Sequence, residues 1–284
     1  MENIKTKLDS VSNMKQLFNS IELSDSEKLK RTEKQLSNYR SFMEEFFWIL
    51  WSTSIDLFKK VNSSFSTKKL ILVFSTDKWF CGNYNNKLFK NVYSEYCDDI
   101  KNVDVFCFWK KSFEFFAKKW FNIVWYLKLS DDFWLEDLSE AYDYFVSSVS
   151  NNVYWDVSVY LNMYKNKINS KTVNYDIYPL EENSLNIFVN NFWINTVKFA
   201  EWASLWVELN QFKLEMEKQL LQYMLYGAAL QNKVAELKSR ISSIQNIKST
   251  SEFVVKDLKL SFNRICQSLL TKEVSNIMEL KTSY

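Results

Sequence analysis

The last quarter of the chain, about residues 208–280, carries the pattern that most constrains the fold. It contains no proline and a single glycine, Gly227. From Leu230 onward, apolar residues recur at alternating steps of four and three, which keeps one narrow stripe of a helix against a partner helix. The members of this seam are Leu230, Val234, Leu237, Ile241, Ile244, Val255, Leu258, Phe262, Ile265 and Leu269. A helix of this length spans on the order of 100 Å, so it needs a partner along its length.

Two polar residues, Lys248 and Ser251, occupy seam positions and interrupt this otherwise apolar pattern. A matching stripe lies at the other end of the chain, where residues 2–60 predict a second long helix. Its apolar members include Ile4, Leu8, Val11, Met14, Leu17 and Ile21. Residues 24–26, Ser-Asp-Ser, are a point where this helix is expected to break or bend. We expect the two helices to pair as an antiparallel coiled coil. The alternative is two separate amphipathic helices packed on a globular core.

The middle of the chain has a different character. Short apolar runs at residues 70–76, 103–109 and 121–127 are typical of strands buried in a parallel sheet. Helical patterns at residues 85–97, 111–120 and 135–149 alternate with these runs, and two further strands are predicted at 153–163 and 172–178. This βαβ rhythm predicts a Rossmann-like α/β domain. Residues 181–195 are polar and rich in Asn, so we interpret them as a linker.

These patterns place the chain in the α/β class, with a long antiparallel coiled coil of terminal helices and an inserted Rossmann-like domain. The expected domains are an N-terminal coiled-coil helix at 1–62, the α/β domain at 68–180, a linker and helix start at 181–207, and a C-terminal coiled-coil helix at 208–284. Two Gly and one Pro among 284 residues fit long helices better than a turn-rich β fold.

Composition excludes several classes of function. The chain has no His, and Cys81, Cys97, Cys107 and Cys266 form no C-x-x-C pair, which excludes ordinary zinc sites and imidazole-dependent catalysis. We expect reduced, mostly buried thiols. A net charge of +2 gives no strong field for nucleic acid. No signal peptide or membrane span is evident, so we expect a soluble, cytoplasmic protein.

Codon drift explains part of the composition. Only four of the 36 basic residues are Arg, and Asn, Phe, Tyr and Lys are abundant. We interpret this as drift toward A/T-rich codons, an origin that the 11 Trp share. On this interpretation, residues such as Trp79 stand where relatives carry a smaller side chain.

The α/β domain lacks a phosphate-binding motif. Gly82 is its only glycine, so neither glycine-rich nucleotide loop is present. One acidic group, at Asp131, Asp132, Glu136 and Asp137, is a candidate cation site. We favour the simpler interpretation, in which these carboxylates cap the helix that follows them.

Three stretches resemble the gamma subunit of F-type rotary ATPases. Residues 4–13, IKTKLDSVSN, are similar to the opening I-R-x-R-I-x-S-V-x-N of that family. Residues 75–85, STDKWFCGNYN, are similar to its motif S-D-R-G-L-C-G-x-x-N, and residues 258–273, LKLSFNRICQSLLTKE, to L-x-L-x-Y-N-K-x-R-Q-x-x-I-T-x-E. The pairs Tyr226-Gly227 and Glu236…Arg240 fall where the family has Y and S-E-x-x-x-R-M. The sequence departs at Trp79, which replaces a Gly, at Asn83, which replaces the second Gly of a pair, and at Cys266, which replaces an Arg.

The resemblance implies a set of contact residues rather than a catalytic site. It implies contact with a catalytic-subunit loop at Arg264, Cys266, Gln267, Thr271 and Glu273. It implies a rotor tip and bearing at Ile4, Leu8, Val11, Leu17 and Ile277, and a turn motif in the α/β domain at Asp77, Cys81 and Gly82. Cys266 cannot donate a guanidinium fork, so we expect a weaker or rewired contact at this position.

The resemblance also implies the function. We expect a non-catalytic central-stalk rotor inside a ring of alpha and beta subunits, with an epsilon-like or other foot protein, at the inner face of the cell membrane. ATP, ADP and Mg are expected in the partner subunits, and no cofactor is expected on this chain. The altered glycines and Cys266 favour a divergent, ATP-hydrolysing complex of mycoplasma type, linked in some cases to gliding motility. The alternatives are an orthodox proton-coupled synthase and a non-rotary coiled-coil adaptor.

Overall fold

Both predicted terminal helices are present. The computed structural model describes residues 2–52, 67–164, 170–195 and 209–282, and in it helix α1 covers Glu2–Ser52 and helix α6 covers Leu209–Thr282. The predicted interruption at residues 24–26 is wrong, because α1 continues through it. The Ser26 hydroxyl donates to the carbonyl of Glu22 at 2.7 Å, and Asp25 is buried against Arg240. The part of the first helix predicted at 53–60 lies outside the described residues.

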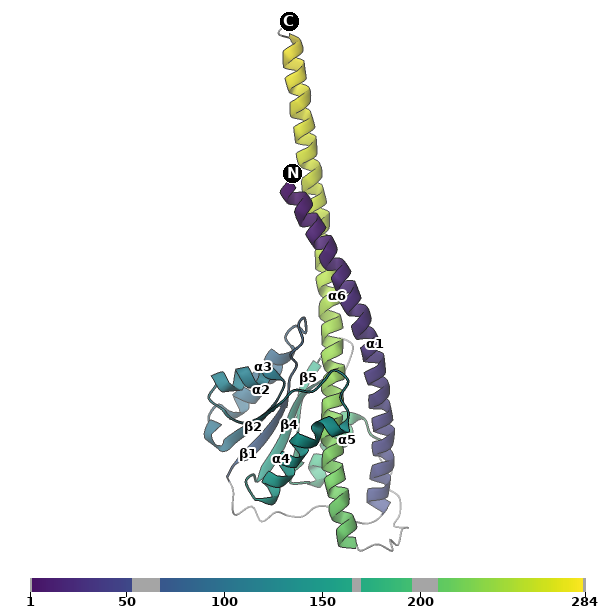
Figure 1. The fold of residues 1–284 in the computed structure, drawn as a ribbon, viewed down its shortest axis with the longest axis vertical. Helices are drawn as coiled ribbons and strands as arrows, with labels where there is room; N and C mark the ends of the chain where they lie inside the picture. The colour runs from purple at the N-terminus through teal and green to yellow at the C-terminus, as the bar shows by residue number, and fades with distance from the viewer. Residues whose placement is uncertain (1, 53–66, 165–169, 196–208, 283–284) are drawn as a thin grey trace. The chain divides into compact units, whose positions relative to one another are not determined.

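The chain divides into two compact units, and both terminal helices contribute to each. Unit 1 comprises residues 1–27 and 240–284, and unit 2 comprises residues 28–239. In unit 1, Lys15 pairs with Glu252, Glu22 with Lys248 and Asp25 with Arg240. The residue numbers of the partners on α6 fall as those on α1 rise. This order confirms the antiparallel pairing of α1 and α6 (Figure 1). The domain boundaries at 62, 68, 180 and 207 stay a prediction.

The seam of unit 1 differs from the predicted apolar stripe of α1. Ile4, Leu8 and Val11 are half-buried as expected, but Met14 and Leu17 are exposed. Continuing the four–three spacing from Val11 leads instead to Lys15, Phe18, Glu22 and Asp25, three of which form the ion pairs above. Lys248 on α6 therefore pairs with Glu22 at 2.6 Å and does not interrupt the contact.

The middle of the chain forms the predicted α/β domain within unit 2. Its elements are β1 (Lys69–Phe74), α2 (Tyr84–Tyr96), η1 (Ile100–Asn102), β2 (Val103–Phe108), α3 (Lys110–Lys118), β3 (Asn122–Leu127), η2 (Leu135–Leu138), α4 (Ser139–Ser150), β4 (Asp156–Tyr164) and β5 (Ser170–Tyr178). The sheet order is β3-β2-β1-β4-β5, parallel except for the antiparallel edge strand β5. The first part of the helix predicted at 135–149 is the 3₁₀ turn η2.

Helices cover both faces of this sheet, which is why β1 and β2 are continuous apolar runs. Leu70, Leu72 and Phe74 of β1 belong to a core shared with α1, α4, α5 and α6. The alternate residues Ile71 and Val73 belong to a second core with α2 and α3. Figure 1 shows α2 and α3 beside the sheet, away from α6. The α/β domain and the unit 2 part of both long helices thus share one core.

The predicted linker at 181–195 is wrong, because helix α5 covers Glu182–Phe192. The segment is rich in Asn, but Leu185, Phe188, Val189 and Phe192 recur at helical spacing and are buried. The Phe188 and Phe192 rings stack with their centroids 4.3 Å apart. Polar composition concealed an amphipathic helix whose apolar face packs against the main core. Residues 196–207 of the predicted linker lie outside the described residues.

In unit 2, α1 and α6 are in close contact at Gly227. A Cβ at this position would overlap the phenol ring of Tyr39 on α1. Tyr39 has no free space to withdraw into, because its side chain is buried and its hydroxyl donates to the carbonyl of Tyr223 at 2.9 Å. The missing side chain at Gly227 therefore sets the distance between the two helices here.

We expect Gly227→Ala to destabilise the protein by about 1–2 kcal/mol in urea unfolding, because overpacking costs more than the roughly 1 kcal/mol that Ala gains in a helix. In a Tyr39→Ala background, the same change is expected to stabilise the protein, since the overlap is gone. A single Gly227→Ala variant with a higher urea midpoint would contradict this account of the contact.

Candidate functional site

The predicted contact residues lie on the last turns of α6, in unit 1. Arg264, Gln267, Thr271 and Glu273 are exposed, while Cys266 is half-buried. The Thr271 hydroxyl donates to the carbonyl of Gln267 at 2.9 Å, within the same helix. The structure therefore presents these side chains on one exposed helix end and leaves their partner contacts a prediction.

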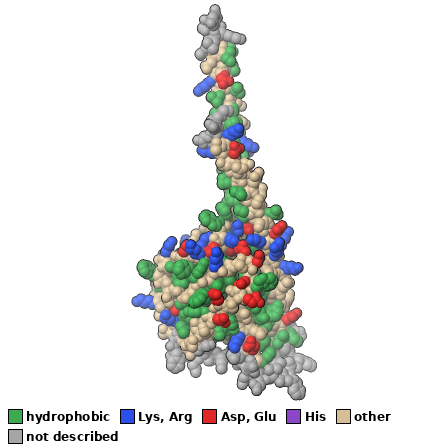
Figure 2. Space-filling view, in the orientation of Figure 1, with side chains coloured by type: hydrophobic (Ala, Val, Ile, Leu, Met, Phe, Trp, Pro, Cys, Tyr) green, Lys and Arg blue, Asp and Glu red, His purple; other side chains and the backbone are tan. Residues whose placement is uncertain are grey.

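The same helix end carries large apolar side chains that are exposed to solvent. Among the described residues these include Phe253, Val254, Leu260, Leu270, Val274, Ile277 and Met278, and the first is 71% exposed. The seam residues Ile265 and Leu269 are exposed as well. Figure 2 shows apolar side chains among polar ones on this part of the chain. A helix that is apolar on more than one side is typical of a segment enclosed by a partner.

The predicted tip residues are in part available to a partner. Leu17 is 63% exposed and Ile277 57% exposed. By contrast, Ile4, Leu8 and Val11 are half-buried, and Leu8 and Val11 line a cavity with Val255. These three residues serve the contact between α1 and α6, and their proposed bearing role stays a prediction.

The turn motif of the α/β domain is brought together in one loop of unit 2. Both carboxylate oxygens of Asp77 accept hydrogen bonds from the start of α3, from the Lys110 N–H at 3.1 Å and the Lys111 N–H at 2.9 Å. The Cys81 carbonyl accepts from the Ser239 hydroxyl of α6 at 2.8 Å. Gly82 has a φ of 57°, a conformation that favours glycine. This turn therefore holds α3 and α6 in place.

A cavity of about 680 Å³ lies beside this turn. It is lined by Lys78, Trp79, Phe80, Cys81, Gly82, Asn85, Asn86, Phe89, Lys111, Glu114, Phe115 and Lys118. Two of its lysines already have partners, since Lys78 pairs with Asp131 and the Lys111 ammonium donates to the carbonyl of Lys78. Its lining gives no further indication of a ligand.

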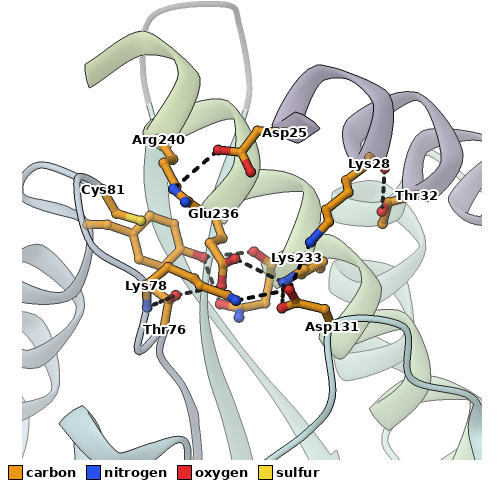
Figure 3. A network of polar contacts seen from close by, with 12 residues as sticks. Asp25, Lys28, Thr32, Thr76, Lys78, Cys81, Asp131, Lys233, Glu236 and Arg240 are labelled. Carbon is orange, nitrogen blue, oxygen red and sulfur yellow. Dashed lines mark hydrogen bonds and ion pairs between the residues drawn. The ribbon is translucent and has the colours of Figure 1, made fainter. Parts of the chain in front are cut away.

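A second site, which sequence reasoning missed, is a cluster of charges around Asp131. One Asp131 oxygen, Oδ2, accepts from Lys28 of α1 at 3.0 Å and from Lys78, after β1, at 2.9 Å. The other, Oδ1, accepts from Lys233 of α6 at 2.9 Å. Figure 3 shows the three lysines converging on this carboxylate. Asp131 thus joins α1, α6 and two loops of the α/β domain.

The cluster extends into the core through Glu236. Lys233 donates to Glu236 Oε1 at 3.0 Å, and the Thr76 hydroxyl donates to Oε2 at 2.5 Å. The side chains of Lys233 and Glu236 are only 5% and 2% exposed. We call Lys28, Thr76, Lys78, Asp131, Lys233 and Glu236 the charged cluster. Its buried charges are all paired, as burial requires.

Burial and charge act in opposite directions on the pKa values of the cluster. Burial disfavours ionised Asp131, but hydrogen bonds from Lys233, Lys78 and Lys28 outweigh it and lower the carboxyl pKa. Burial disfavours charged Lys233, but Glu236 and Asp131 raise its pKa overall. Because its pKa is lower in the folded chain, the Asp131 carboxylate stabilises the fold at pH values above its unfolded-state pKa. This stabilisation is lost on acidification below about pH 4. Because its pKa is higher in the folded chain, the Lys233 ammonium stabilises the fold below about pH 10, and this stabilisation is lost as the pH rises above that value.

Neutral hydrogen bonds reinforce this attachment of α6. The Asn232 amide donates to the carbonyl of Ser75 at 2.9 Å, and the Tyr84 hydroxyl donates to Asn232 Oδ1 at 2.7 Å. All three residues are buried. Helix α6 is therefore bonded directly to the carboxyl end of β1 and the start of α2.

The candidate cation cluster has a different role. Asp137 accepts from the Trp134 N–H at 2.8 Å at the start of η2, which confirms the predicted cap for that residue. Asp131 binds lysines instead of capping a helix. Within the described ranges, no group of three or more His, Cys, Asp or Glu is placed to hold a metal ion. The sequence signal for the cluster was slight: Lys233 and Glu236 lie three apart on a helix, and Lys28 and Asp131 are 103 residues apart.

We expect Lys233→Met to destabilise the protein by about 3–5 kcal/mol, because it leaves the buried Glu236 carboxylate without its cation. The matched control is Lys110→Met, which removes an exposed ion pair with Glu114 and should change stability by less than about 0.5 kcal/mol. Urea unfolding of both variants measures the difference. Equal losses in the two variants would mean that the cluster contributes no more than a surface pair.

Comparisons with known proteins agree with this architecture. The family model described as ATP synthase matches residues 1–279. The ATP synthase gamma chain of Amoebophilus asiaticus is 23% identical over 98% of this chain and 97% of its own length. That of Limosilactobacillus reuteri is 21% identical over 96% of this chain and 95% of its own length.

Solved structures show the same fold. A chain of the Euglena gracilis mitochondrial ATP synthase, in a structure of OSCP, F1 and c-ring, aligns with a TM-score of 0.68 and 13% identity, over 99% of this chain and 93% of that one. A chain from the Tetrahymena thermophila central stalk and c-ring structure aligns with a TM-score of 0.57 and 15% identity, over 81% of this chain and 99% of that one. With the family model covering nearly the whole sequence, the chain belongs to the ATP synthase gamma-chain family.

Proposed function

We propose that the chain is the central rotor of an F-type ATP synthase or ATPase, turning inside a ring of alpha and beta subunits. The observation that carries this proposal is the apolar, exposed end of α6. Leu270 and Met278 are 61% and 65% exposed. The relatives include ATP synthase gamma chains that this chain matches over nearly their full length. Such a helix end needs an enclosing partner, and a ring of subunits provides one on every side.

Rotation and catalysis are linked in this proposal by a stiff helix. Helix α6 runs unbroken from Leu209 to Thr282, so torque applied at its exposed end passes along one continuous element. The charged cluster and the Asn232 bonds attach that helix to the α/β domain in unit 2. Different faces of the rotor bias nucleotide occupancy in the three catalytic sites, which is a coupling free energy between distant sites.

The chemistry belongs to the partners. We propose that ATP, ADP and Mg²⁺ bind in the ring, that an epsilon-like or other stalk protein contacts the α/β domain, and that neither nucleic acid nor a cofactor is involved. The complex would lie at the inner face of the cell membrane, which this subunit contacts only indirectly. Within its described residues, the chain has no helix long and apolar enough to span a bilayer.

The divergent, mycoplasma-type version with a link to gliding motility stays a hypothesis. It rests on the departures at Trp79, Asn83 and Cys266 and on the A/T-drifted composition. Trp79 does not distort the turn, since the positive φ angles there belong to Phe80 and Gly82. The curated relatives of this chain include ATP synthase gamma chains matched over nearly their whole length. We therefore propose the orthodox synthase as the main function and the divergent motor as the second.

Purification of the tagged chain from its own cells under mild conditions tests the rotor directly. We expect two nucleotide-binding subunits in threefold excess, together with ATPase activity. A proton-channel ring in the same preparation supports the orthodox synthase, and unfamiliar proteins in its place support the repurposed motor. A preparation without any ATPase subunit would contradict both versions and leave the coiled-coil adaptor.

The exposed end of α6 makes a sharper prediction. Replacing Leu270 and Ile277 together with Asn should weaken binding to the ring at least tenfold, since burying each apolar side chain contributes about 1.5–3 kcal/mol. The control is Ser275→Asn, which alters the same exposed turns without removing apolar surface. Titration of labelled chain against the isolated ring measures both. Unchanged affinity in the double variant would contradict enclosure of this end.

A further inference from the structure

Among the residues that the structure describes, five other than glycine adopt positive φ angles, and three of these are tryptophans. They are Phe80 at 63°, Trp109 at 68°, Trp120 at 65°, Asn152 at 54° and Trp193 at 52°. Asn tolerates this left-handed region, whereas a bulky side chain there is an outlier, because its Cβ crowds the neighbouring carbonyl. Tryptophan is therefore concentrated where the backbone disfavours it.

Trp120 stands at the position after α3 that glycine usually fills. The Trp120 N–H donates to the carbonyl of Ala117 at 3.2 Å, and the Phe121 N–H to that of Phe116 at 3.2 Å. These two bonds form a Schellman motif, whose left-handed residue is most often Gly and sometimes Asn. The indole does not compensate for the strain by packing, because Trp120 is 88% exposed.

The same motif ends two other helices. After α5, the Trp193 N–H donates to the carbonyl of Asn190 at 3.4 Å, and the Ile194 N–H to that of Val189 at 3.1 Å. After α4, the Asn152 N–H donates to the carbonyl of Val149 at 2.9 Å, and the Val153 N–H to that of Ser148 at 3.0 Å. The third motif has Asn at the left-handed position, in accordance with the usual preference, while the other two have Trp.

Trp109 adopts a conformation that is more restricted still. Between β2 and α3 its φ is 68° and its ψ 155°, a region that is essentially limited to glycine. Its N–H donates to the carbonyl of Leu127 at 2.9 Å, so the β2–α3 connection fixes this backbone. The side chain is buried at 6% exposure, but the backbone is that of a glycine turn.

Composition gives an independent line of argument. The chain has two glycines and 11 tryptophans among 284 residues, whereas ordinary glycine usage of about 7% gives roughly 20 glycines. Trp79, 77% exposed, stands where the gamma motif has Gly. Large exposed indoles and missing glycines thus occur together.

We propose that the protein made in its own cells carries glycine at positions 109, 120 and 193, and at position 79. Glycine and tryptophan codons can differ in the first base alone. The meaning of a codon such as UGA differs between genetic codes. If it is read as glycine in these cells and as tryptophan elsewhere, one residue replaces the other at all four positions together.

The proposal changes the functional interpretation of the surface. With glycine at position 79, the motif after β1 comes closer to the family pattern, from which it still departs at Asn83. The argument for a divergent motor then loses one of its supports. The exposed indoles of Trp79 and Trp120 are then no part of a docking surface. Cys266 is unaffected.

Peptide mass spectrometry of the chain purified from its own cells tests the proposal. We expect the peptides that contain positions 120 and 193 to carry glycine, with masses lower by the difference between the two residues. Tryptophan at either position would overturn the proposal. This result is independent of any partner, so the rotor and the residue identities can fail separately.

A stability measurement tests the physical argument on the chain that carries tryptophan at these positions. Trp120→Gly should shift the folding equilibrium toward the native state by roughly fivefold or more, because it relieves a left-handed conformation. The matched control is Trp48→Gly, also an exposed Trp but inside α1, where glycine should shift the equilibrium the other way. A Trp120→Gly variant no more stable than its parent would overturn the argument from strain.

Discussion

The fold of unit 2 depends on a buried charge pair, Lys233 with Glu236, on the face of α6 that meets the α/β domain. Burying two charges is costly unless each is satisfied, and here Asp131 and Thr76 complete the pairing. Apolar packing alone would let a helix slide or rotate on the sheet. Fixed hydrogen-bond partners instead allow one register of α6 against the domain, which the proposed rotor needs in order to carry torque.

The sequence predicted most of the architecture, because apolar periodicity reports the faces that are buried. The runs at 70–76 and 103–109 became β1 and β2, and the four–three seam faces α1 except at its end, where Ile265 and Leu269 are exposed. Prediction from the sequence failed where polar residues form the contact between elements. Lys15, Glu22 and Asp25 continue the seam of α1 as ion pairs, so the apolar residues Met14 and Leu17 were misleading. Helix α5 was missed for the related reason that many Asn residues concealed its apolar face.

The candidate site was predictable only in part. Motif resemblance located Asp77 and Gly82 in one turn and placed Arg264 and Glu273 on the exposed end of α6. The charged cluster was not predictable, since Lys28, Asp131 and Lys233 come together only in the folded chain. Positive φ at Trp120 and Trp193 likewise appears only in three dimensions. At Trp120, which is 88% exposed, the local sequence rule fails without any packing that would explain the exception. The Trp193 ring packs only against the Arg40 guanidinium, 5.0 Å from its centroid, among the contacts of the described residues.

Single-molecule rotation tests the central claim, that this chain turns within a catalytic ring, most directly. A bead attached through half-exposed Cys97, which follows α2, in a Cys266→Ser background, would report the motion of the chain against a surface-bound ring of alpha and beta subunits, since Cys81 and Cys107 are buried. We predict unidirectional, ATP-dependent rotation of the bead. A chain that binds the ring and stays still while ATP is hydrolysed would contradict the rotor and favour a static structural role.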